Sequence, residues 1–172
     1  MTLVRMGAVV AVVLAVGINS HLAYAAEPVL AAGAVFEDWT VECEQRPQDN
    51  RRICFLTQTL IATESKERLL KLSIGRFGAA NELMAIGILP LGISIPAGVT
   101  LRVDGLAPTP LHVQRCTAEG CLAATALDKA LADRLYAGKE IEIEIVPYGG
   151  REVSTIRIAL RGYAAGYTAL KL

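Results

Sequence analysis

The side chains in this sequence best suited to chemistry are its four cysteines, Cys43, Cys54, Cys116 and Cys121. An even number of cysteines is typical of disulfide bonds in exported proteins, because compartments beyond the inner membrane are oxidising. Of the three possible pairings we predict Cys43–Cys54 and Cys116–Cys121, because each of these pairs brackets a turn. A zinc site of four thiolates is the alternative. Zinc ligands usually lie about two to four residues apart, and the gap between Cys43 and Cys54 is far wider.

Residues suited to catalysis are scarce. His112 is the one histidine outside the N-terminal leader described below, and a serine hydrolase needs a nucleophile, a base and an orienting group. Asp104 is the most distinctive carboxylate, but the pair Asp104-Gly105 is explained by a turn. The candidate nucleophiles are Ser73, Ser94 and Ser154. None of these serines lies in a nucleophile-elbow pattern. We therefore predict that the protein is not an enzyme, with no catalytic, cofactor-binding or metal-binding residues. A hydrolase that uses paired carboxylates is kept as an alternative.

The N-terminus has the pattern of a secretory signal peptide. Arg5 provides a positive charge, residues 7–18 are apolar, and Ala23-Tyr24-Ala25 offers a small-residue cleavage site. We predict cleavage after Ala25, with cleavage after Ala26 as the alternative, which leaves a single domain of residues 26–172. The expected location is the periplasm, or the cell surface and medium after secretion.

The charge pattern excludes some partners. The chain has 17 basic and 17 acidic residues, and the two signs are interspersed. Proteins that bind nucleic acid carry a basic stripe or patch, so nucleic acid is not an expected partner. After the leader, no apolar run approaches the roughly 20 residues of a membrane-spanning helix.

Alternating apolar and polar residues predict a chain of short strands. We expect an all-β fold, an antiparallel β-sandwich of about eight to ten strands with two disulfides. One short helix is predicted at about residues 128–137, capped by Gly138 and lying across one end of the sheets. The strands expected from alternation cover residues 38–44, 53–61, 68–77, 82–89, 93–95, 99–104, 111–115, 140–145 and 153–160.

The strand at residues 140–145 places three glutamates on one face. A solvated face explains this pattern better than a cation site, and Arg151, Arg157 and Arg161 are the expected cross-strand partners.

Two hairpin tips are the predicted binding loops, because recognition is commonly carried by loops on a rigid scaffold. One tip contains Arg46, Arg51 and Arg52, and the other contains Tyr148 and Arg151. The alternative is that both tips are merely solvated turns.

The order of the distinctive residues resembles the invasion-associated locus B family over nearly all of the chain after the leader. The residues that carry this resemblance are Trp39-x-Val41-x-Cys43, Cys54, Gln58, Pro96-x-Gly98-Val99, Leu101-x-Val103-Asp104, Cys116, Gly120-Cys121, Leu160-x-Gly162-Tyr163 and Ala169-Leu170. Tyr163 stands where phenylalanine is expected, and its hydroxyl needs a partner. All of these residues have structural explanations, so the resemblance transfers no catalytic residue.

The resemblance implies an exported protein of a Gram-negative bacterium with a role in host-cell invasion or in the cell envelope. We therefore predict a non-enzymatic binding protein whose partner is a protein or a component of the envelope or cell surface. A periplasmic protein that supports envelope integrity is the main alternative.

Overall fold

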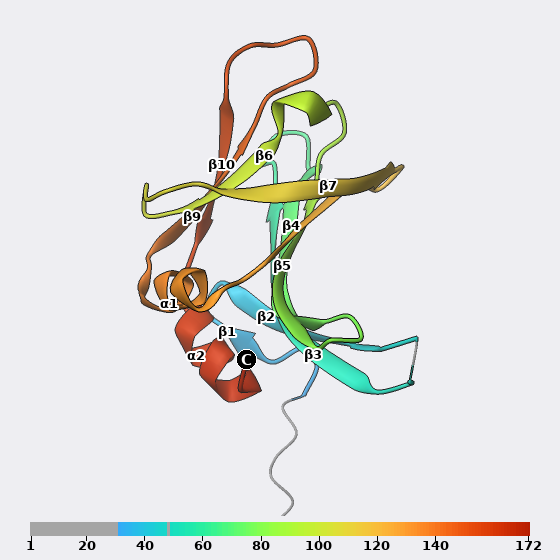
Figure 1. The fold of residues 1–172 in the computed structure, drawn as a ribbon, viewed down its shortest axis with the longest axis vertical. Coiled ribbons are helices and arrows are strands. Elements are labelled where there is room, and N and C mark those ends of the chain that lie inside the picture. The colour runs from blue at the N-terminus through green and yellow to red at the C-terminus, as the bar shows by residue number, and fades with distance from the viewer. Residues whose placement is uncertain (1–30, 48) are drawn as a thin grey trace, which may run out of the picture.

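The computed structural model describes residues 31–47 and 49–172 (Figure 1). The predicted signal peptide, residues 1–25, lies outside these residues, so the leader and the start of the domain at residue 26 remain predictions. In the part of the chain that the structure describes, no helix is long and apolar enough to cross a membrane.

Antiparallel strands make up most of the described chain. They are β1 (Val35–Phe36), β2 (Trp39–Gln45), β3 (Arg52–Ile61), β4 (Arg68–Phe77), β5 (Glu82–Leu89), β6 (Val99–Val103), β7 (Thr109–Thr117), β8 (Gly120–Ala126), β9 (Glu140–Ile145) and β10 (Ser154–Ala159). In the sheet they follow the order β1-β2-β3-β4-β5-β8-β7-β6-β9-β10. The predicted all-β class is confirmed. Strands β1 and β8 were not predicted, and the strand expected at residues 93–95 is only a bridge at Ile93 followed by a 3-10 turn, Ile95–Ala97.

Strand β7 joins the two halves of the sheet. Residues 109–111 pair with β6, while residues 112–117 pair with β8, and the register shifts between Val113 and Arg115. Such a bulge bends a strand and increases its twist. The sheet therefore curls, and β6, β9 and β10 form a second layer that gives the fold its sandwich-like shape (Figure 1).

Trp39 links the two ends of this curled sheet. Its side chain is fully buried, and its Nε1 donates to the carbonyl of Ala159, at the end of β10, over 3.1 Å. Arg161 adds a two-point ion pair with Asp38, at 2.8 and 2.9 Å. The core between the layers consists of inward side chains from alternating positions, including Val41, Leu56, Leu70, Leu72, Ile74, Leu101, Ile141, Ile143 and Ile158.

Helix α1 (Lys129–Ala137) confirms the predicted helix. The Asp128 carboxylate caps it by accepting from the Leu131 N–H over 2.7 Å. Gly138, however, is not a left-handed cap, because its φ is −77°. Glycine fits there because a Cβ would come within 2.7 Å of Val103 Cγ1.

A second helix, α2 (Tyr163–Leu170), was not predicted. It follows Gly162, whose φ is +82°, and it lies directly against β3: a Cβ on Gly166 would come within 2.5 Å of Leu56 Cδ2. The Tyr136 ring of α1 packs edge-on against Tyr167 of α2. Tertiary contacts therefore stabilise a helix that has no side-chain cap and contains a glycine, both unfavourable to an isolated helix.

The two disulfides pair as predicted. Cys43 lies opposite Cys54 across β2 and β3, and Cys116 lies opposite Cys121 across β7 and β8. Both bonds are formed, with Cα atoms 4.1 and 3.9 Å apart. Each disulfide therefore fixes the register of one hairpin.

Candidate functional site

The residues first considered for catalysis lie on different elements, and two of them, Ser73 and Asp104, make structural contacts. His112 is exposed on β7, opposite Ala124. The Ser73 hydroxyl lies 3.1 Å from the Thr57 hydroxyl. The Asp104 carboxylate accepts backbone N–H bonds from Lys139 and Glu140 at 3.0–3.2 Å. Among the described residues, no cluster of three His, Cys, Asp or Glu side chains could hold a metal ion.

The glutamates of β9 form ion pairs along the sheet. Arg157 lies 3.3 Å from Glu140 and 3.6 Å from Glu142, as the sequence suggested. Glu144 instead accepts bonds from Thr100 and from Arg102 of β6, at 2.7 and 2.9 Å. The Thr100 hydroxyl, together with Arg102, lowers the pKa of Glu144 below its ordinary value. Arg161, also suggested as a partner, pairs with Asp38 instead. These acids are therefore part of a paired surface ladder.

The first predicted binding loop is partly structural. Arg46 was expected to be exposed, but only 7% of its surface is accessible. Its Nε donates to Asp49 over 2.9 Å and its Nη1 donates to the Gly78 carbonyl over 2.8 Å. The Arg46 guanidinium lowers the pKa of Asp49 to about 2. Arg46 therefore joins its loop to the β4–β5 turn, and only Arg51 and Arg52 remain exposed.

The second predicted loop belongs to a larger exposed surface. Tyr148 is 83% exposed, and three further large apolar side chains on neighbouring loops are more than half exposed: Leu91, Ile95 and Val153. We call these four residues the apolar end. The loops that carry them lie at the top of Figure 1, opposite the end where α2 lies. Arg151, the other predicted residue of this loop, is exposed beside them.

Backbone contacts hold the loops of the apolar end together. The Ser94 N–H donates to the Val146 carbonyl and the Tyr148 N–H donates to the Gly92 carbonyl, both over 2.7 Å. Ile93 and Pro147 form a β-bridge between them. Two segments that are far apart in the sequence therefore act as one support for the exposed side chains.

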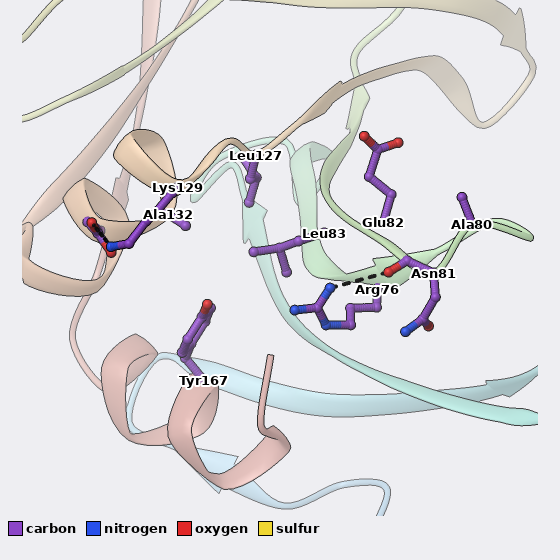
Figure 2. A pocket seen from close by; sticks show the side chains of 10 residues that line it. Arg76, Ala80, Asn81, Glu82, Leu83, Leu127, Lys129, Ala132 and Tyr167 are labelled. Carbon is purple, nitrogen blue, oxygen red and sulfur yellow. Dashed lines mark hydrogen bonds and ion pairs between the residues drawn. The ribbon is translucent and has the colours of Figure 1, made fainter.

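An open cleft lies between the β4–β5 hairpin and the two helices and has a volume of about 670 Å³ (Figure 2). Its cations already have partners: Lys129 pairs with Asp133 over 2.6 Å, and Arg76 donates to the Asn81 carbonyl over 3.3 Å. Figure 2 shows the Glu82 carboxylate pointing away from both cations. No group of charges converges on one point, so this cleft is a weaker candidate than the apolar end.

The exposure of Tyr148 was predicted from the sequence, whereas Leu91, Ile95 and Val153 were not singled out. A usable signal was present, because residues 90–99 contain no charged side chain. Two prolines and two glycines in that segment predict a rigid loop, and the exposure of the apolar residues in such a loop could have been inferred.

Comparisons with known proteins agree on one family. A family model for invasion associated locus B (IalB) proteins matches residues 39–171. Invasion protein B homologues from two strains of Brucella abortus, 2308 and biovar 1 strain 9-941, are each 26% identical over 130 residues, which is 76% of this chain and 73% of the relative. The crystal structure of invasion associated protein B from Bartonella henselae has the same fold. It gives a TM-score of 0.71 at 20% identity, covering 82% of this chain and 95% of that one.

Proposed function

We propose that this chain, which belongs to the invasion associated locus B (IalB) family, is an exported protein that binds a partner and catalyses no reaction. The partner is a protein or another component of the cell surface or envelope. The binding surface is the apolar end, in which Tyr148 is the most exposed side chain, and Arg151 lies in the same loop as Tyr148.

The exposure of the apolar end is the observation that carries this proposal. Its four large side chains are 53–83% exposed, although burying one such side chain completely contributes about 1.5–3 kcal/mol. Exposed apolar patches that are held in place commonly mark interaction sites. Because backbone bonds already order the loops, a partner would bind without a large entropic cost of ordering them.

Three carboxylates paired with arginine are unsuited to acid–base catalysis. The carboxylates with lowered pKa values that have ion-pair partners are Asp38, Asp49 and Glu144, and each faces an arginine. Groups poised for acid–base catalysis need pKa values near the working pH. Pairing with arginine moves a carboxylate away from that range.

Export is supported by the predicted leader and by the two disulfides, since disulfides persist in oxidising compartments. The names of the Brucella and Bartonella relatives associate those proteins with invasion. A role of this chain in host-cell invasion is part of the proposal and rests on that similarity.

Binding to cells tests the proposal directly. Labelled oxidised protein of residues 26–172 would be applied to cultured host cells and, separately, to bacterial envelope fragments. We expect a double variant, Ile95→Ser with Tyr148→Ser, to lose at least tenfold in binding. The comparison variant, Arg51→Ala with Arg52→Ala, changes the exposed arginines of the other predicted binding loop. It should bind normally, because the proposal places the binding surface at the apolar end. Equal binding by both variants would contradict a role for the apolar end.

Location separates the invasion role from envelope support. The N-terminal sequence of the processed protein should begin at Ala26. Protease added to intact bacteria should cleave a protein that acts on host cells. A protein that is protected, and that is released only by osmotic shock, would favour the envelope role.

A further inference from the structure

Strand β5 is apolar on both of its faces. One face carries Leu83, Ala85 and Leu89, which are buried in the core. The other carries Met84, Ile86 and Ile88, which are half-buried. An antiparallel strand with one solvated face normally alternates between apolar and polar residues. The second apolar face of β5 is therefore only partly buried by the described residues.

The open face of β5 forms the floor of a hollow. Ile88 lies opposite Leu122 of β8, so these side chains share a face. Phe55 and Phe77 form a wall, with ring centroids 5.1 Å apart. Gly75 allows this arrangement, because a Cβ there would come within 2.4 Å of the Phe55 Cβ.

The hollow has the size and lining of a small-molecule site. Its volume is about 340 Å³, and a second hollow of about 270 Å³ shares Ile88, Arg115 and Leu122 with it. The two hollows are therefore adjacent, and together we call them the sheet groove. Sites for small ligands are commonly concave and mostly apolar, with a few polar groups.

Arg115 is the free cation of the sheet groove. It is exposed on β7, next to the register shift that brings it opposite Leu122. Its guanidinium has no hydrogen bond or ion pair with any residue that the structure describes. In contrast, Lys71 in the same groove is paired with Glu42 over 2.7 Å. Two further acids line the groove: Glu44, which comes from β2, and Glu119 in the β7–β8 turn, whose carboxylate accepts from the Thr117 hydroxyl.

We propose that the sheet groove binds an anionic single-chain amphiphile. The alkyl chain lies over Ile86, Ile88 and Leu122 and against the Phe55 wall, and the carboxylate binds the Arg115 guanidinium. Two features support this ligand class: an apolar floor for the chain, and an unpaired guanidinium suited to a carboxylate. The site is separate from the apolar end, so a failure of this proposal would not contradict the proposed function, and a failure of the proposed function would not contradict this proposal.

Titration with laurate, below its micelle concentration and at about pH 8 where a carboxylic acid is ionised, tests this inference. Calorimetry would give the affinity, and amide chemical shifts would locate the site. We expect laurate to shift signals from Ile86, Ile88 and Leu122. Dodecyltrimethylammonium has the same chain and the opposite charge, and should bind at least tenfold more weakly. Acetate, which has the head and no chain, should show no binding.

Substitution of Arg115 supplies the decisive comparison. Arg115→Gln, at an exposed position, should fold normally and should weaken laurate binding by about tenfold or more, because a charge-assisted bond is lost. Arg52→Gln, an exposed arginine outside the groove, is the matched control and should leave the affinity unchanged. Equal affinities for laurate and the cationic detergent would overturn the proposal. An unchanged affinity in Arg115→Gln, or a dimer through this face that excludes laurate in sedimentation, would overturn it as well.

Discussion

The Tyr163 hydroxyl offers a sharp test of the packing between α2 and the sheet. The side chain is fully buried against Trp39, and its oxygen has no hydrogen-bond partner among the described residues. An unpaired buried hydroxyl costs about 1–3 kcal/mol, while removing the oxygen forfeits only a few contacts of roughly 0.1–0.2 kcal/mol each. Tyr163→Phe should therefore raise the free energy of unfolding by about 1 kcal/mol.

Urea and thermal unfolding measure this change. For a domain of this size, about 1 kcal/mol corresponds to a Tm increase of about 3 °C. Tyr148→Phe removes the same atom from an 83% exposed side chain, so it is the matched control and should leave Tm unchanged. A Tyr163→Phe protein that is less stable than the wild type by 1 kcal/mol or more would refute the reasoning. That result would mean that the hydroxyl has a partner, such as a buried water.

The loss of stability at alkaline pH provides a second test of the Tyr163 prediction. Burial, with a smaller contribution from Tyr167, raises the pKa of the Tyr163 hydroxyl above its ordinary value. In the unfolded chain a tyrosine ionises near pH 10, whereas folded Tyr163 keeps its proton. The wild type should therefore lose stability as the pH rises above about 10. Tyr163→Phe lacks this loss, so its advantage should grow between about pH 10 and pH 11.

Three further substitutions or titrations test the fold. Gly166→Ala should lower the free energy of unfolding by about 1–3 kcal/mol in urea melts, because its Cβ would overlap Leu56; a neutral result would mean that α2 can move away at no cost. Asp104→Ala should cost about 1 kcal/mol through loss of the backbone bonds that its carboxylate accepts, and an unchanged Tm would contradict this. Asp49 should titrate near pH 2 by NMR, so its stabilising contribution should be complete above about pH 4 and lost as the pH falls through 2. In Arg46→Gln that titration should move up toward the ordinary range, and an unmoved pKa would exclude Arg46 as its cause.

Local patterns predicted the hairpins of this protein well. The alternation in Glu140–Ile145 located β9 at its observed bounds, because a strand with one buried face must alternate. The strand predicted at residues 68–77 also matches β4. The disulfide pairs also followed from local spacing. By contrast, β8 was missed, because Gly120–Ala126 is apolar on both faces and has no alternation to detect.

The predicted binding residues also separate into those whose exposure a local pattern predicts and those whose burial depends on distant contacts. Tyr148 could be found from a turn signal between two strands. Arg46 looked equally exposed in the sequence, but it is buried because the β4–β5 turn supplies the Gly78 carbonyl that it bonds. That carbonyl is 32 residues away along the chain, and no local pattern encodes the contact.

The sequence by itself determined the class of fold, the disulfide pairs and the family, because each depends on residue types at short spacing or in a fixed order. Only the tertiary structure decided where α2 packs, which exposed side chains gather at the apolar end, and that Arg115 stands unpaired over the sheet groove. These features depend on contacts between distant segments. Helix α2 is stabilised by its packing against β3, and both candidate binding surfaces arise where the curled sheet and its loops bring separate parts of the chain together.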